Sequence, residues 1–223
     1  MVGDKTRNKV TLYACPHACS FVSHLALQIS GAEFKVKWIN LFQQEQSTPE
    51  YLALSPRGKV PLLLSADCCV SENIAILTWL TQKFPQARLL PDPQSADFVG
   101  AISTLSWFSS GIHPFLSRVI APNRFAKTEA GADEVRESAM ESLAMEFARI
   151  DARMENREWW GEALSALDFY PLWLWARSGE STFDQSPYPH YMRYVRRLLT
   201  VRDVMYVLEH ERSYMECYAG LDS

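Results

Sequence analysis

The apolar pattern of this 223-residue chain changes its period near residue 90, and that change limits the folds available to it. Strand-like runs at 10–13 and 34–39 flank a segment with helical spacing at 21–29. A hairpin follows at 58–64 and 68–73, and then a helical pattern from Ile74 to about Phe84. The order strand, helix, strand, hairpin, helix predicts an α/β unit of roughly ninety residues.

The remainder of the chain is predicted to be helical. Three prolines close the α/β unit and mark a linker: Pro85, Pro91 and Pro93. Beyond it, one helical run contains Ala101, Leu105, Phe108, Ile112, Phe115 and Val119, and a second contains Val135, Ala139, Leu143, Phe147, Ile150 and Met154. We therefore expect an α/β domain at 1–90, a linker at 91–96 and an all-helical domain at 97–223.

A helix start is predicted at residues 164–169. Ser165 is expected to be the N-cap, and Asp168, three residues on, to return the hydrogen bond of a capping box, with Leu164 and Phe169 as a hydrophobic staple. This pattern makes Asp168 a folding residue rather than a catalytic acid.

Charge and composition limit the classes of partner that this chain is expected to bind. The net charge is −4 and no Lys/Arg-rich block occurs, which argues against a nucleic-acid partner. The first twenty residues contain no signal-peptide core, and no apolar run is long enough to span a bilayer, so we expect a cytoplasmic protein without a membrane partner. Cysteines in such a compartment are mostly reduced, which favours a reactive thiol over a disulfide framework. His17 between two cysteines supplies too few ligands for a closed metal site, so no metal is expected.

Two cysteines in "YACPHACS", at 13–20, are the first candidates for chemistry. Proline is favoured at the first helical position, so Pro16 predicts that Cys15 is a helix N-cap whose thiol pKa is lowered by the helix dipole. Cys19 lies one predicted turn later, on the same face, and gains less from the dipole. Cβ atoms at this spacing are about 5–6 Å apart, too far for an unstrained disulfide. The alternative is that both are small buried residues.

Three further features are candidates. Val60-Pro61 begins an apolar strand, where a cis bond is an option. Ser71 precedes the next helix as a possible cap, with Asn73 and backbone N–H groups as donors to an anion, although a plain polar helix start fits equally well. A polar stripe at helical spacing contains Ser106, Ser110, His113 and Ser117. Its histidine is either a satisfied structural residue or a group that reaches into an interdomain cleft.

With these segments in this order, the chain resembles the glutathione S-transferase family over nearly its whole length. "SPRGKVPLLL" at 55–64 is similar to the strand that this family enters through a cis-proline, and "SENIAILTWL" at 71–80 to its glutamate-led γ-glutamyl site. "LSALDFYPLW" at 164–173 is similar to its capping box. The resemblance implies a thioredoxin-like α/β domain followed by an all-α domain.

Within the family, "LYACPHACSFVSHLAL" is similar to the start of the bacterial beta class. Cys19 matches the beta-class cysteine that contacts glutathione, and His113 matches the helix histidine that faces its thiol. Cys15-Pro16 resembles instead the Cys-Pro of glutaredoxins and omega-class transferases, and Asn73 stands where the family more often has Ser or Gly. Which thiol meets glutathione therefore stays open, with a preference for Cys19 and with Cys15 close enough to resolve or replace it.

The resemblance also implies a function and a binding site. The expected activity is conjugation of the co-substrate glutathione to small electrophiles, glutathione-dependent thiol-disulfide exchange with a disulfide substrate, or both, in a homodimer. Val60, beside Pro61, is expected to pair its backbone with the cysteinyl part of glutathione, Glu72 and Asn73 to hold the γ-glutamyl end, and Lys59 to meet the glycyl carboxylate. The alternative is a non-catalytic protein of this fold that serves as an interaction or ligand-binding module.

Overall fold

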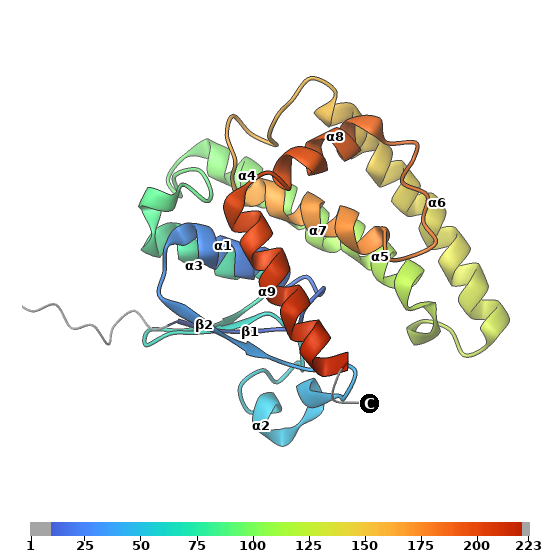
Figure 1. The fold of residues 1–223 in the computed structure, drawn as a ribbon, viewed down its shortest axis with the longest axis horizontal. Coiled ribbons are helices and arrows are strands. Elements are labelled where there is room, and N and C mark those ends of the chain that lie inside the picture. Colours follow the sequence, from blue (N-terminus) through green and yellow to red (C-terminus); the bar gives the residue numbers. More distant parts are fainter. Residues whose placement is uncertain (1–9, 220–223) are drawn as a thin grey trace, which may run out of the picture. The chain divides into compact units, whose positions relative to one another are not determined.

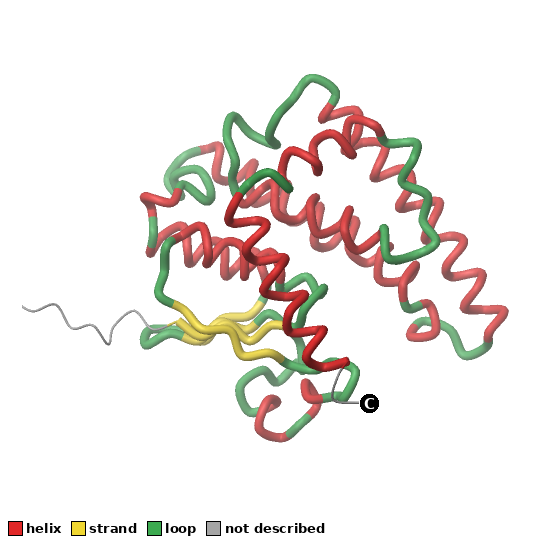
Figure 2. Tube along the Cα trace, viewed as in Figure 1, coloured by secondary structure: helices red, strands yellow, loops and turns green. Residues whose placement is uncertain are grey.

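The computed structural model describes residues 10–219, with side chains described as far as Met215. It divides into two compact units. The first contains the residues up to Phe98 together with the chain from Arg202 onward, and the second is Val99–Val201. Figure 2 shows all the strands in the first of these units.

A four-stranded sheet forms the centre of the first unit. Its strands are β1 (Val10–Ala14), β2 (Phe34–Trp38), β3 (Leu62–Leu64) and β4 (Cys69–Ser71), in the order β2-β1-β3-β4. β1 pairs with β2 in parallel, whereas β3 pairs antiparallel with both β1 and β4. The predicted strands and hairpin are confirmed.

Helices cover both faces of this sheet. α1 (Phe21–Ser30), α3 (Asn73–Lys83) and α9 (Arg202–Ala219) lie on one side, and the short α2 (Pro49–Leu52) lies on the other (Figure 1). α1 ends at Gly31, whose φ of +71° is the left-handed conformation that glycine adopts without steric cost. Leu12, Leu63 and Leu77 are fully buried, and they form part of the core between the sheet and the helices.

The last helix departs from the expected division of the chain. α9 packs against α1 in the first unit, although residues 97–223 were expected to form one helical domain. Val204 and Val207 are fully buried, and Asp203 accepts a hydrogen bond from Nε2 of Gln28 at 3.0 Å. An amphipathic pattern shows that one face of a helix is buried but not which part of the protein buries it, so the sequence could not place α9.

The second unit is helical, as expected. It contains the rest of α4 (Ala96–Ser106), a π-helical segment at Trp107–Ile112, α5 (His113–Ile120), α6 (Glu129–Met154), α7 (Phe169–Ser178) and α8 (Pro189–Leu198). Single 3₁₀ turns lie at Glu45–Ser47, Pro85–Ala87, Pro122–Arg124 and Ala166–Asp168 along the chain.

The π-helical segment interrupts the first predicted helical run. Just beyond this segment, on α5, Leu116 is buried. Phe115, which the helical spacing had placed in the core, is only half-buried. Positions three and four residues after Ile112 both fall on its side of a helix, so the pattern alone could not choose between these two side chains.

The capping box at Ser165 is confirmed. The Ser165 hydroxyl accepts from the backbone of the first turn, and the Asp168 carboxylate accepts from the Ser165 backbone N–H at 2.8 Å. Asp168 is fully buried and also accepts from the Trp160 N–H at 2.7 Å and from the Tyr194 hydroxyl at 2.6 Å. Burial raises the pKa of this carboxyl, and these hydrogen bonds oppose the increase. Asp168 thus connects three segments of the helical unit.

Candidate functional site

The two candidate cysteines lie in a loop rather than on a helix. We call residues 15–20 the thiol loop. α1 begins only at Phe21, with Ser20 as its N-cap, so the prediction that Cys15 caps the helix is wrong. The Ala18 N–H donates to the Cys15 carbonyl at 3.2 Å, and His17 has a φ of +61°. Proline followed by a left-handed residue is the arrangement of a type II turn, which Pro16 favours as readily as a helix start.

Ser20 closes the thiol loop onto its first residue. The Ser20 hydroxyl accepts from the Cys15 N–H at 3.1 Å and donates to the Cys15 carbonyl at 3.0 Å. Cys15 is buried, and its thiol donates to the Pro16 carbonyl, with Sγ and O 3.5 Å apart. Because Cys15 is not at the helix end, the helix dipole gives no reason for a lowered pKa, and the two cysteines do not share a helix face.

Cys19 faces the start of β3. Its thiol donates to the Val60 carbonyl, with Sγ and O 3.9 Å apart, and its own carbonyl accepts from Nδ2 of Asn73 at 2.9 Å. Burial, and next the negative charge of Glu72, raise the pKa of the Cys19 thiol to about 12. Cys19 is therefore protonated at neutral pH and acts as a hydrogen-bond donor. Cys15 and Cys19 are both thiols rather than members of a disulfide.

The segment before β3 contains three predicted residues, of which Val60 contacts the thiol loop. The Val60–Pro61 peptide bond is cis, the option that the sequence left open. The Lys59 side chain is exposed, and its carbonyl accepts from the Tyr51 hydroxyl at 2.8 Å and from the Ser55 hydroxyl at 3.2 Å. The backbone is thus fixed at this point while the lysine ammonium group faces solvent.

Glu72 presents an accessible carboxylate at the start of α3. It is the N-cap residue, with a φ of +73° and no side-chain capping bond, so the expectation that Ser71 caps this helix is wrong. The Ser71 hydroxyl instead accepts from Arg57 at 2.6 Å, and the same guanidinium lies 3.1 Å from the Glu72 carboxylate. Both charged side chains of this ion pair are mostly exposed. Arg57 was missed by the sequence analysis because nothing in its local pattern connects it to residues 71–72.

Asn73 is placed beneath the thiol loop. It is buried, its amide nitrogen donates to the Cys19 carbonyl, and its amide oxygen accepts from the Ser23 hydroxyl at 2.6 Å. Its side chain therefore connects α1, α3 and the thiol loop, whereas the sequence analysis expected it to face an anion. Asparagine performs this bridging role here because its amide both donates and accepts.

His113 belongs to the second unit, where it begins α5. It is half-buried, and its ring packs edge-on against Trp173 with centroids 4.6 Å apart. Burial lowers the pKa of His113 to about 4, so the imidazole is neutral at neutral pH. The expected contact between His113 and the glutathione thiol stays a prediction.

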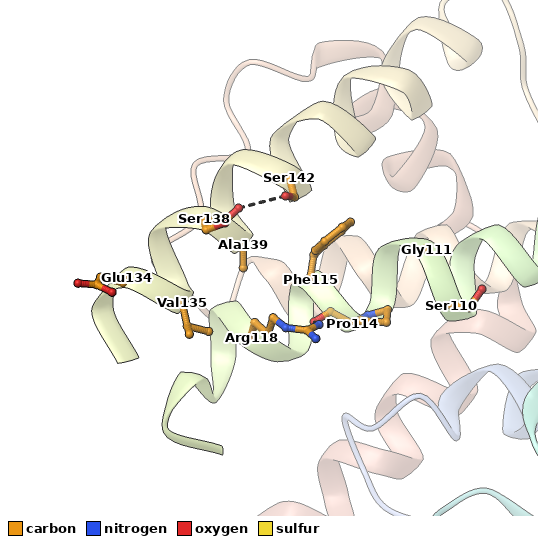
Figure 3. A pocket seen from close by; sticks show the side chains of 10 residues that line it. All are labelled: Ser110, Gly111, Pro114, Phe115, Arg118, Glu134, Val135, Ser138, Ala139 and Ser142. Atoms are coloured by element: carbon orange, nitrogen blue, oxygen red, sulfur yellow. Dashed lines mark hydrogen bonds between the residues drawn. The ribbon is translucent and has the colours of Figure 1, made fainter. Parts of the chain in front are cut away.

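The polar stripe that included His113 does not form one continuous surface. The π-helical segment lies between Ser106 and His113, and the Ser110 hydroxyl donates to the Ser106 carbonyl at 2.7 Å. Ser110 lines a groove of about 610 Å³ between α5 and α6, which contains none of the other stripe residues (Figure 3). Figure 3 shows Phe115 and Arg118 on the α5 side of this groove and Ser138 and Ser142 on the α6 side. The groove therefore lies within the second unit, and His113 does not line it.

The described residues contain neither a metal-binding cluster nor a membrane-spanning helix. Among the side chains that the structure describes, no group of three or more His, Cys, Asp and Glu residues could hold a metal ion. No helix in the described part of the chain is long and apolar enough to cross a membrane. The side chain of Cys217 lies outside the described residues.

Comparisons with known proteins agree with the fold. Residues 8–82 match the family model described as "Glutathione S-transferase, N-terminal domain". "Glutathione S-transferase GST-4.5" from Xanthomonas campestris is 24% identical over 90% of this chain and 98% of its own length. A beta-class glutathione S-transferase from Sphingomonas chungbukensis is 26% identical, with a TM-score of 0.81 over 90% of this chain and 98% of that one. A sphingomonad glutathione S-transferase solved with glutathione is 27% identical, with a TM-score of 0.80 over the same shares. The thiol loop, Val60, Pro61 and Glu72 all lie within the matched residues.

Proposed function

We propose that this protein is a glutathione S-transferase that conjugates glutathione to small electrophiles, because residues 8–82 match the N-terminal domain model of that family and 91% of the chain superimposes on a solved structure with that fold. One observation carries the proposal. The Cys19 thiol lies against the Val60 carbonyl at the cis bond to Pro61, so a thiol group and the backbone segment expected to pair with glutathione meet at one place.

Binding of glutathione uses residues of the first unit. The backbone of Val60 pairs with the cysteinyl part of glutathione, and Lys59 meets the glycyl carboxylate. Glu72 receives the γ-glutamyl amino group, for which its exposed carboxylate is suited. The role of Asn73 changes: because its side chain is engaged beneath the thiol loop, its backbone N–H at the start of α3 is the group offered to the γ-glutamyl carboxylate.

Cys19 acts as a hydrogen-bond donor in this proposal. A thiol whose pKa is raised to about 12 keeps its proton, and on binding it turns from the Val60 carbonyl to the glutathione sulfur. A donor at that position stabilises the thiolate form of glutathione. The thiolate then forms a carbon–sulfur bond with the electrophile, whose leaving group departs with the electron pair of the broken bond. Neutral His113 supplies a second hydrogen bond to the sulfur.

Thiol-disulfide exchange is the second activity within the same site. Here the small thiolate fraction of Cys19 attacks the glutathionyl sulfur of a mixed disulfide and releases the other thiol as its thiolate. A glutathione thiolate then attacks the Cys19–glutathione disulfide, which forms oxidised glutathione and restores the Cys19 thiolate. Cys15, four residues away along the chain, is the residue that resolves the mixed disulfide in this proposal. A homodimer is proposed from the family resemblance.

The test measures binding and both activities side by side. Calorimetry with glutathione, conjugation of a chlorinated aromatic electrophile and reduction of a glutathione mixed disulfide are each followed for the wild type. Binding with conjugation supports the proposal, and binding with disulfide reduction only makes exchange the main activity. Binding without either activity favours a ligand-binding module, and no binding at millimolar glutathione contradicts the proposal.

The thiol assignment needs its own experiment. Cys15→Ser and Cys19→Ser are treated with oxidised glutathione and weighed intact. We expect the adduct to be lost from Cys19→Ser and retained by Cys15→Ser. Equal adducts on both variants would show that neither cysteine acts alone.

A further inference from the structure

Glu211, on α9, connects the C-terminal helix directly to the thiol loop. Its side chain is buried, and Oε2 of its carboxylate accepts from the His17 backbone N–H at 3.0 Å. This contact joins residues 194 positions apart in the chain. No local sequence pattern indicates it, and the proposed function above does not use it.

This hydrogen bond is made by the thiol-loop residue whose backbone conformation is the least favourable. His17 has a φ of +61°, a conformation that non-glycine residues seldom adopt and keep only where the surroundings fix it. A hydrogen bond from a backbone N–H to a carboxylate is among the stronger kinds in proteins. The His17 side chain is exposed, and this contact connects the backbone of the turn to α9.

The other oxygen of the same carboxylate is also engaged. Oε1 of Glu211 lies 3.1 Å from Nδ1 of His24, a fully buried residue on α1. Because a carboxylate only accepts, Nδ1 is the donor. The His24 ring is surrounded by aromatic side chains, with Trp38 and His210 at centroid distances of 5.6 and 5.3 Å. These contacts hold the carboxylate in one orientation, aimed at the thiol loop.

We propose that Glu211 is a positioning residue: its carboxylate holds the His17 turn and thereby places the Cys19 thiol against the Val60 carbonyl. The other end of the thiol loop is already tied by Ser20 to Cys15 and by Asn73 to Cys19. Without Glu211, the His17 N–H loses its acceptor on α9, and the Cys19 thiol samples several positions. The activity readouts of this inference rest on the proposed function, whereas its structural readout does not.

The first experiment measures amide hydrogen exchange of the thiol loop in the full-length protein. In Glu211→Ala, we expect exchange at His17 to accelerate roughly ten-fold or more, because its N–H loses a buried acceptor. In Glu211→Gln, the amide oxygen can still accept from the His17 N–H, and the amide nitrogen can donate to Nδ1 of His24 once that ring carries its proton on Nε2, so exchange at His17 should stay within about two-fold of the wild type. The matched control is Asp203→Ala, which removes the Gln28 contact between the same two helices and should leave the thiol loop unchanged.

The second experiment measures glutathione binding and conjugation kinetics. Glu211→Ala should raise the KM for glutathione roughly ten-fold and lower kcat, and Glu211→Gln should restore both. If wild-type protein does not bind glutathione, the proposed function fails while the exchange experiment still decides the positioning role.

Three results would overturn the inference. They are unchanged exchange at His17 in a folded Glu211→Ala, the same loss in Asp203→Ala as in Glu211→Ala, and a Glu211→Gln variant as impaired as the alanine variant. If Glu211→Ala does not fold, Glu211→Asp decides, since its shorter side chain cannot reach both partners. Accelerated exchange at His17 in that variant supports the role, and wild-type exchange contradicts it.

Discussion

The protonation state of Cys19 can be tested directly, and it decides how this site handles glutathione. Its pKa of about 12, against an ordinary value of 9.0, makes the thiolate about a thousand-fold scarcer at neutral pH than in an unperturbed cysteine. Since only the thiolate reacts with alkylating reagents, alkylation of Cys19 should be slowed by a comparable factor.

The assay follows iodoacetamide labelling of the peptide that contains Cys19, by mass spectrometry, from mildly acidic to alkaline pH. We expect the rate to rise steadily with pH, without a plateau in the range where the protein stays folded. Glu72→Gln should accelerate labelling at neutral pH, because the charge of Glu72 is the second cause of the raised pKa. Glu50→Gln, which removes an exposed carboxylate on α2, is the matched control and should label like the wild type.

A labelling plateau that begins at or below neutral pH would refute this reasoning. It would show that the folded protein holds Cys19 as a thiolate, and covalent capture of glutathione would then replace hydrogen-bond donation as its role. Identical labelling rates in Glu72→Gln and the wild type would contradict only the contribution of the Glu72 charge to the raised pKa of Cys19.

Three further outcomes are expected. Asp168→Ala should lower the free energy of unfolding in urea by about 3–5 kcal/mol, because it leaves the Trp160 N–H and the Tyr194 hydroxyl buried without their acceptor; a loss below about 1 kcal/mol would contradict the network. His113 should titrate near a pH of about 4 by NMR, and the free energy of unfolding should fall as pH drops from the ordinary value of 6.5 towards that point, since the unfolded chain binds a proton that the folded protein does not. His113→Phe should make that slope shallower, while His210, whose pKa is also lowered by burial, retains part of it; an unchanged slope would assign it to groups other than His113. Asn73→Ala should cost about 1–3 kcal/mol of stability and raise the KM for glutathione, measured by urea unfolding and steady-state kinetics, since the thiol loop loses its bond to α3.

Local sequence patterns were sufficient to predict the strands of the sheet and the helices that follow them. Alternation and helical spacing predicted the strands of the sheet and the helices that follow them, because each reports which faces of a segment are buried. The capping box at Ser165 and Asp168 was predicted for the same reason, since all its partners lie within four residues. The cis bond before Pro61 was an option that the structure selected.

The sequence predicted the residues of the candidate site better than it predicted their geometry. Pro16 is compatible with a helix start and with a turn, and the turn forms because contacts from Ser20, Asn73 and Glu211 hold the thiol loop. Once Cys15 leaves the helix end, the argument for its lowered pKa no longer applies. Asn73 was expected to face a ligand, and its side chain instead bridges α1 and the thiol loop.

The sequence by itself therefore determined the order of the secondary structure, the capping box and the set of residues from which the thiol site is drawn. Tertiary structure alone decided that α9 joins the first unit, that its Glu211 reaches the His17 turn, and that Cys19 lies at the Val60 carbonyl as a protonated thiol. The physical reason is the separation along the chain over which each effect acts. Periodicity, capping and turn preference act over a few residues, whereas burial and the charge of Glu72 act on Cys19 only after folding has brought distant segments together.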